Sequence, residues 1–292
     1  MQNMSLSHLA YELKDPEVLR SPIVFASPHS GREYSKEFLQ SSVLDARVIR
    51  SSEDAYVDQL IDFIPEMGAP LLLAKVPRAY VDLNRAADEL DPSLINDVHS
   101  RAQNPRITSG LGVIPRVVSN ARAIYRGKLS KPEALARIDQ YWFPYHRALQ
   151  RLLTRAHACF GYSLLIDMHS MPHEAVTHLG KPNQGIDVVL GDRYGASADI
   201  ALGDLIEQAF ETQKFRVSRN VPFAGAYITQ RYGQPGQSKH VVQVELDRAL
   251  YLDEVEVAPS ERFGELKDRL KSVLRYVIEE TAQPPENRLA AE

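Results

Sequence analysis

The chain of 292 residues is poor in cysteine, with Cys159 as its single one. A lone cysteine excludes an intramolecular disulfide and any metal site built from several thiolates. The sequence also has no apolar run approaching the ~18 residues that a membrane-spanning helix needs, and residues 1–15 lack the basic-then-apolar pattern of a secretory signal. We therefore expect a cytoplasmic protein, with Cys159 as a small buried residue rather than a nucleophile.

Excess charge of either sign is missing as well. The 34 lysines and arginines against 38 aspartates and glutamates give a net charge of −4, and the pI is near 6.2. Binding to nucleic acid needs clustered excess cations, so neither nucleic acid nor a membrane is expected as a partner. No linker of convincing length separates two cores. We expect an N-terminal extension over 1–20, one domain over 21–282 and a flexible tail over 283–292.

What is present is an alternation of short apolar runs with longer segments of helical period, which is typical of an α/β domain. Strands are expected over 23–26, 71–74, 162–167, 186–190, 215–218 and 241–246. Helices are expected over 57–64, 135–153, 199–210 and 262–279, and Pro144 should kink or divide the second of them. The segment 86–131 has little periodicity, which is typical of functional or mobile segments.

Two histidines, His29 and His169, each lie just past the carboxyl end of a predicted strand, where ligand sites form in open α/β sheets. They are either a converging metal pair or two loop histidines bonded to backbone. With no cysteine cluster, a third ligand has to be oxygen. Asp54 and Glu53 are suitable, although 51–54 also fits a helix-capping box that would explain Asp54 without a metal.

Two further carboxylates have two interpretations each. Asp167, two residues before His169, either holds that imidazole in one tautomer or simply ends its strand in a turn. Glu245 faces away from the apolar side chains of its own strand. It is either the ion-pair partner of Arg248 or a general base whose pKa burial has raised.

The run from Pro77 to Arg85 ends in Asn84 and Arg85, and includes Arg78. An arginine fork binds carboxylates in bidentate fashion, and an adjacent amide adds donors. Arg126 is a weaker candidate of the same kind. The sequence has no G-x-S-x-G elbow, no P-loop and no dinucleotide fingerprint.

Five short motifs together resemble the N-formylglutamate amidohydrolase family, and they follow one another in that family's order. They are Ser27-Pro28-His29-Ser30-Gly31, Val81-Asp82-Leu83-Asn84-Arg85, Pro144-Tyr145-His146, Ile166-Asp167-Met168-His169-Ser170, and Val244-Glu245-Leu246 continuing to Tyr251-Leu252-Asp253-Glu254. The resemblance implies a phosphorylase/hydrolase-like fold similar to that of zinc carboxypeptidases: a single α/β domain with a mixed, mostly parallel central sheet flanked by helices. Residues 21–282 would form the catalytic domain.

The resemblance also implies one zinc or other divalent ion held by His29 and His169 with an acidic ligand. The chain departs from the carboxypeptidase His-x-x-Glu pairing, because Arg32 stands three residues after His29. Asp54 is the preferred third ligand and Glu53 the second choice.

The remaining roles follow from the same resemblance. Glu245 would be the general base and Arg126 a catalytic group beside the oxyanion, while Arg78, Asn84 and Arg85 would bind substrate. The implied reaction cleaves the formyl C–N bond of N-formyl-L-glutamate, giving formate and L-glutamate in histidine degradation.

The implied partner is a small dicarboxylate amide, and the implied assembly is a monomer or homodimer. The alternatives are a zinc deacylase or carboxypeptidase acting on another N-acyl amino acid or peptide, and a non-catalytic carboxylate-binding protein.

Overall fold

The structure is a computed structural model that describes residues 10–99, 104–179 and 185–282. The predicted tail over 283–292 and the first nine residues of the predicted N-terminal extension lie outside these ranges. Within the described part of the extension, Tyr11–Lys14 form the edge strand β1, which pairs antiparallel with β3 of the central sheet. None of the helices in the described ranges has the length and apolar character needed to cross a bilayer.

The centre of the fold is a seven-stranded sheet in the order β1-β3-β2-β6-β9-β7-β8. The strands after β1 are β2 (Ile23–Ser27), β3 (Leu71–Ala74), β6 (Ser163–Met171), β7 (Val188–Gly191), β8 (Val217–Arg219) and β9 (Lys239–Asp247). Four neighbouring pairs run parallel, and only the β1–β3 and β7–β9 pairs are antiparallel. The expected mixed, mostly parallel sheet is confirmed.

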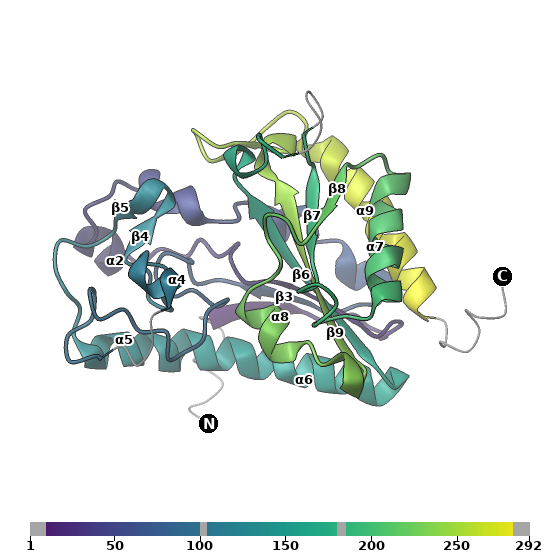
Figure 1. The fold of residues 1–292 in the computed structure, drawn as a ribbon, viewed down its shortest axis with the longest axis horizontal. Helices are drawn as coiled ribbons and strands as arrows, with labels where there is room; N and C mark the ends of the chain where they lie inside the picture. The colour runs from purple at the N-terminus through teal and green to yellow at the C-terminus, as the bar shows by residue number, and fades with distance from the viewer. Residues whose placement is uncertain (1–9, 100–103, 180–184, 283–292) are drawn as a thin grey trace.

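Helices cover both faces of this sheet, because alternate side chains of a strand point to opposite faces. On β2, Ile23 and Phe25 join the core beneath α7 (Ile200–Thr212) and α9 (Phe263–Ala282). Val24 and Ala26 join the opposite core, against the long helix α6 (Phe143–Phe160). Figure 1 shows α6 lying along one side of the sheet and the α7–α9 pair packed on the other.

The remaining helical elements are short. They are α2 (Lys36–Ser41), η1 (Val48–Ser52), α3 (Val57–Leu60), η2 (Ile64–Met67), α4 (Pro105–Thr108), η3 (Ser119–Ala121), α5 (Lys131–Arg137), η4 (Ile138–Trp142), η5 (His173–Ala175), α8 (Tyr227–Tyr232), η6 (Pro235–Gln237) and η7 (Arg248–Leu250). Two small hairpins pair β4 (Val117–Val118) with β5 (Arg122–Ala123) and β10 (Leu252–Asp253) with β11 (Ala258–Pro259). Within 86–131, the described residues are mainly irregular, as expected.

The structure corrects several predicted boundaries. The helix expected over 57–64 is α3 followed by the 3₁₀ turn η2, because Pro65 has no N–H and its ring would clash with the Ile61 carbonyl in a continuous helix. At Pro144, α5 and α6 are joined by the π-helical turn η4, so the predicted division is confirmed.

Two single residues also differ from expectation. The strand predicted to stop at residue 167 continues to Met171, so that His169 lies within β6 rather than after it. Cys159 is exposed near the end of α6 rather than buried.

Candidate metal centre and substrate cavity

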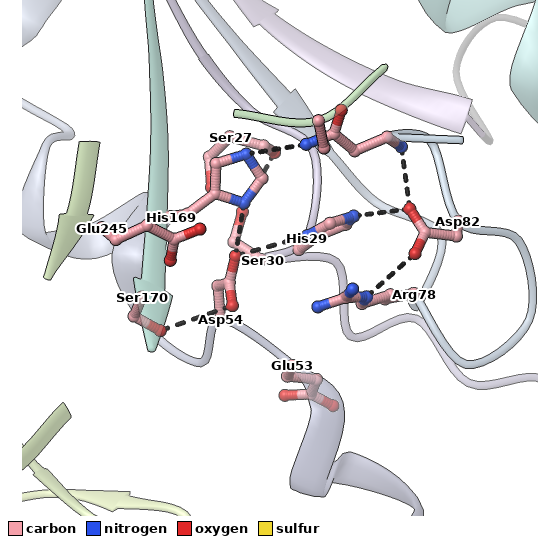
Figure 2. A network of polar contacts seen from close by, with 12 residues as sticks. Ser27, His29, Ser30, Glu53, Asp54, Arg78, Asp82, His169, Ser170 and Glu245 are labelled. Carbon is pink, nitrogen blue, oxygen red and sulfur yellow. Dashed lines mark hydrogen bonds and ion pairs between the residues drawn. The ribbon is translucent and has the colours of Figure 1, made fainter. Parts of the chain in front are cut away.

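Three side chains far apart in the sequence meet near the carboxyl ends of the central strands β2 and β6. His29 follows β2, His169 lies on β6, and Asp54 comes from the turn between η1 and α3. One candidate ligand atom from each lies within 4.8 Å of the other two, and all three residues are buried. The two imidazole rings are 4.8 Å apart between centroids. The predicted pair of histidines and its preferred carboxylate are thus brought together (Figure 2).

Carboxylates behind both histidines set the orientation of the rings. Asp82 Oδ1 lies 2.7 Å from His29 Nε2, and Asp167 Oδ2 lies 3.0 Å from His169 Nε2. A carboxylate only accepts, so each Nε2 carries a hydrogen and each Nδ1 faces the cluster. His169 Nδ1 lies 2.8 Å from Asp54 Oδ2. Asp167 therefore has the orienting position that the sequence suggested.

The electrostatics of the cluster follow from this close placement of acids and imidazoles. Burial disfavours the charged forms of His169 and Asp54, but their opposite charges and hydrogen bonds outweigh it. The charge of Asp167 and hydrogen bonds to Asp167 and Asp54 raise the pKa of His169 well above its usual value. The hydrogen bond from His169 and the positive charge of that imidazole lower the pKa of Asp54 well below its usual value. An anionic Asp54 and a protonated His169 are therefore the stable pair here.

The donor set fits a divalent metal ion. Buried His29 Nδ1 has no hydrogen-bond partner among the described residues, although buried polar atoms are normally satisfied. It lies 3.5 Å from Asp54 Oδ2, the same oxygen that His169 Nδ1 contacts at 2.8 Å. Two imidazole nitrogens and one carboxylate oxygen match zinc sites that keep a position open.

Glu53, the second choice for the acidic ligand, is turned away from the histidines. Its carboxylate accepts from Tyr34 at 2.6 Å and from Arg50 at 3.1 Å. Figure 2 shows it well apart from the cluster, while Asp54 points into it. The helix that follows, α3, has Tyr56 as its N-cap residue, whose φ is 63° and whose side chain makes no capping bond. The capping box considered as the alternative explanation of Asp54 is thus absent.

Glu245 lies beside the cluster because of the register of two strands. In the parallel β6–β9 pair, His169 is opposite Glu245 and Asp167 is opposite Gln243. Burial raises the pKa of the Glu245 carboxyl to about 7, against the opposing charge of His169. Gln243 Nε2 donates to Glu245 Oε1 at 2.8 Å. This is the pKa range in which a carboxylate both accepts and returns a proton near neutral pH.

Arg248 is not the partner of Glu245. Its guanidinium donates to Asp54 Oδ1 at 3.3 Å and to the Ser170 hydroxyl at 3.1 Å. A further bond reaches the Glu53 carbonyl. The ion pair considered for Glu245 therefore forms with Asp54 instead, and Glu245 has no cation within ion-pair distance among the described residues.

A cavity of about 730 Å³ opens over this cluster. We call one side the strand wall, which comprises His29, His169, Gln243 and Glu245. A second group of lining residues, which we call the loop wall, comes from the chain after β3, including α4, and comprises Arg78, Asn84, Arg85 and Arg106. Asn84 Nδ2 lies 3.3 Å from His169 Nε2, so the two walls meet at the cluster.

Side chains of the η4–α6 helix bind the backbone of the loop wall through hydrogen bonds. His146 Nε2 donates to the Leu83 carbonyl at 2.9 Å, and Trp142 Nε1 donates to the Arg85 carbonyl at 2.9 Å. The hydroxyl of Tyr232 lies 2.9 Å from His146 Nδ1. Burial lowers the pKa of His146 to about 3, so the ring stays neutral in the folded protein. The Pro144-Tyr145-His146 motif thus has a positioning role.

One predicted site residue is not brought to the cavity. Arg126 is exposed and lines a separate surface hollow with Gln40 and Lys128. The reason is local: Ser42 pairs with Tyr125 in an isolated antiparallel bridge, which fixes this stretch of chain beside α2. Arg126 is therefore wrongly placed by the sequence argument.

Three residues of the site were given no role by the sequence argument. Asp82 was part of a noted motif, and Gln243 could have been found because it lies two residues before Glu245 on the same strand face. Arg106 lies in the irregular segment, where no periodicity relates it to any other residue of the site.

Comparison with known proteins agrees with this geometry. The sequence profile of N-formylglutamate amidohydrolase matches residues 21–252. The N-formylglutamate deformylase of Pseudomonas aeruginosa is 33% identical over 263 residues, which cover 89% of this chain and 92% of that protein. That of Pseudomonas putida is 31% identical over 242 residues, covering 81% and 84%.

A solved structure gives the same result in three dimensions. The crystal structure of N-formylglutamate amidohydrolase from Ralstonia eutropha superposes with a TM-score of 0.87 at 32% identity, covering 94% of this chain and 98% of that one. Profile, relatives and structure extend over nearly the whole domain that contains the site. The chain belongs to the N-formylglutamate amidohydrolase family.

Proposed function

We propose that this protein hydrolyses N-formyl-L-glutamate to formate and L-glutamate with the help of one divalent metal ion, zinc in the first instance. The observation that carries the proposal is the position of buried Glu245, opposite His169 in the sheet register and beside a compact cluster of two histidines and one aspartate. Membership of the family supports the substrate.

His29, Asp54 and His169 would hold the metal through two nitrogens and one oxygen. When bound, zinc would polarise a carbonyl oxygen and lower the pKa of water to about 7. Asp82 and Asp167 keep the two rings turned with Nδ1 toward the cluster. The proton that His169 Nδ1 shares with Asp54 has to leave when a metal binds.

Glu245 would act as the general base and then as the general acid. Its carboxylate takes a proton from the attacking water and returns it to the amide nitrogen as the formyl C–N bond breaks. A pKa of about 7 suits both transfers near neutral pH. Gln243 fixes one oxygen of this carboxylate and leaves the other free for the proton.

Asn84 and Arg85 would bind a substrate carboxylate on the loop wall. Arg78 takes the place that the sequence argument gave to Arg126: it lines the cavity, and its Nε is held by Asp82 at 3.1 Å. The rest of its guanidinium is then available to the oxyanion of the substrate. A formate and glutamate product pair would suit a role in histidine degradation.

A substrate panel tests the function. Purified protein is assayed with N-formyl-L-glutamate, N-acetyl-L-glutamate and a peptide ending in glutamate, and formate, acetate and glutamate are quantified. We expect formate and glutamate in equal amounts from the first substrate only, with loss of turnover after chelation. Comparable turnover of the acetyl or peptide substrate would favour a deacylase or carboxypeptidase. Binding without product would favour a carboxylate-binding protein.

A further inference from the structure

Four arginines line the cavity among the described residues, and two of them already have carboxylate partners. Arg78 pairs with Asp82 at 3.1 Å, and Arg248 pairs with Asp54 at 3.3 Å. Arg85 and Arg106 form no ion pair with any carboxylate in the described part of the chain. The cavity therefore presents two uncommitted guanidinium groups.

Arg85 is the more unusual of the two, because it is only 7% exposed. Its hydrogen bonds go to neutral carbonyls, those of Leu111 at 3.0 Å and Asn84 at 2.9 Å. Burial lowers its pKa, and the charges of Arg78 and Arg106 lower it further, against the opposing charge of Asp82. Arg85 and Arg106 thus add two like charges to the lining of one cavity, an arrangement that an anionic ligand relieves.

The backbone of Leu111 links the Arg85 side chain to the Arg106 backbone. The Leu111 N–H donates to the Arg106 carbonyl at 2.8 Å, and the Leu111 carbonyl accepts from Arg85 Nε at 3.0 Å. The Asn104 side chain caps α4 by accepting from the Arg106 N–H at 2.9 Å. The backbone that carries Arg106 is therefore tied to the Arg85 side chain before any ligand arrives.

The two groups lie at different depths. Arg85 is buried and follows Asn84, which reaches the cluster at His169. Arg106 is exposed and lines the same cavity from α4. In N-formylglutamate the α-carboxylate carbon is two bonds from the amide nitrogen, and the side-chain carboxylate carbon is four. An inner and an outer cation match this order.

We propose that Arg106 is the specificity-determining residue that binds the side-chain carboxylate of the substrate, while Arg85 binds the α-carboxylate. This assignment rests on the proposed function, and it names the residue by which the site would select an acidic over a neutral side chain. The selectivity follows from the pair: a neutral side chain leaves Arg106 without the anion that offsets its charge.

Steady-state kinetics of Arg106→Gln test the assignment, with N-formyl-L-glutamate compared against its neutral isostere N-formyl-L-glutamine. We expect kcat/KM for the glutamate derivative to fall by about 10- to 100-fold, mainly through KM, as for loss of a charged hydrogen bond. The glutamine derivative should change by less than about twofold, and Arg106→Lys should recover part of the loss. Arg126→Gln, an exposed arginine outside the cavity, is the matched control.

An equal loss on both substrates, or an unchanged preference for glutamate, would overturn the role of Arg106. Failure of the proposed function would look different, because the wild type would then release no formate from either substrate. In that case, the affinities for glutarate and butyrate measured by calorimetry still test whether Arg106 binds the second carboxylate. We expect Arg106→Gln to weaken glutarate binding about tenfold and leave butyrate unchanged, and equal glutarate affinity in both proteins would reject the assignment.

Discussion

The two walls of the cavity are built in different ways. The strand wall owes its geometry to the sheet: the register of β6 and β9 sets His169 opposite Glu245, and β2 delivers His29. The loop wall has no such lattice. Its residues are positioned by individual hydrogen bonds, such as that of Arg85 Nε to the Leu111 carbonyl and that of Trp142 Nε1 to the Arg85 carbonyl.

This difference suggests a division of labour. Proton transfer needs groups fixed within a narrow range of distance, which neighbouring strands provide. Substrate selection is a matter of charge and reach, and loops vary without disturbing the core. Changes on the strand wall should therefore act on kcat, and changes at the substrate-binding residues of the loop wall, Asn84, Arg85 and Arg106, on KM.

The sharpest test of this division is Glu245→Gln. The amide is nearly isosteric but cannot accept the proton, so kcat should fall by about 10²- to 10⁴-fold while KM stays within a few fold. Glu256→Gln, in an exposed ion pair with Arg47, is the matched control. Near-normal turnover in Glu245→Gln, with folding and metal content unchanged, would remove Glu245 from the base role.

Arg85→Gln makes the corresponding change on the loop wall. We expect kcat/KM to fall by about 10- to 100-fold, carried by KM, because a buried charge-assisted bond to the substrate is lost. Arg85→Lys should restore part of the affinity but not the bidentate geometry. Parallel kinetics on both variants provide the measurement. A fall in kcat at unchanged KM would contradict the division between the walls.

Gln243→Leu sharpens the comparison within the strand wall. The Gln243 side chain joins Glu245 to the Ala226 backbone, donating to the carboxylate at 2.8 Å and accepting from the Ala226 N–H at 3.2 Å. Its loss frees the carboxylate to rotate, and we expect a fall in kcat of about tenfold. Gln243→Glu, which sets a second acid beside Glu245, should be worse than Gln243→Leu. Unchanged kcat in both would show that the sheet alone positions Glu245.

The smallest effect on turnover is expected from His146, beneath the loop wall. Its pKa is about 3 in the folded protein and about 6.5 when unfolded, so the unfolded chain binds the extra proton between these values. The stability contributed by neutral His146 is complete above about pH 6.5 and is lost as the pH falls toward 3. Urea unfolding between pH 6 and 4 should show a slope shallower by up to about 1.4 kcal/mol per pH unit in His146→Gln.

The control for that measurement is Gln150→Ala, since Gln150 is exposed on the same helix and has no ionisable group. It should leave the pH slope unchanged. An identical slope in the wild type and His146→Gln would mean that His146 is not held neutral by its contacts with Leu83 and Tyr232.

Much of the strand wall could be predicted from the sequence. Apolar runs before His29 and around Glu245 identify strands, and parallel strands bring their carboxyl ends to one edge. Register could not be read in this way, so neither the His169–Glu245 pairing nor the role of Gln243 was predicted. The extent of β6 was also missed, because Asp167 and His169 look like a polar strand end. In the structure both side chains are buried, since they form a hydrogen bond with each other.

The loop wall was predicted less well, for a physical reason. Nothing periodic relates Arg85, Arg106 and Arg126 across an irregular segment, so an arginine inside the cavity and one outside it look alike in the sequence. Their positions depend on tertiary contacts such as the Leu111 bridge and the Ser42–Tyr125 pairing. Whether Asp54 or Glu53 faces the two histidines depended likewise on the tertiary contacts of two neighbouring residues.

The central claim is that one metal ion at His29, Asp54 and His169 enables the groups of the strand wall to cleave the formyl amide. Titration of chelated, metal-free protein with zinc tests it directly, with formate release from N-formyl-L-glutamate followed at each addition. The account predicts negligible activity before zinc, a linear rise and a break at one equivalent per chain, with no rise in His169→Ala. Full turnover of the metal-free protein, or zinc-restored turnover in His169→Ala, would contradict it.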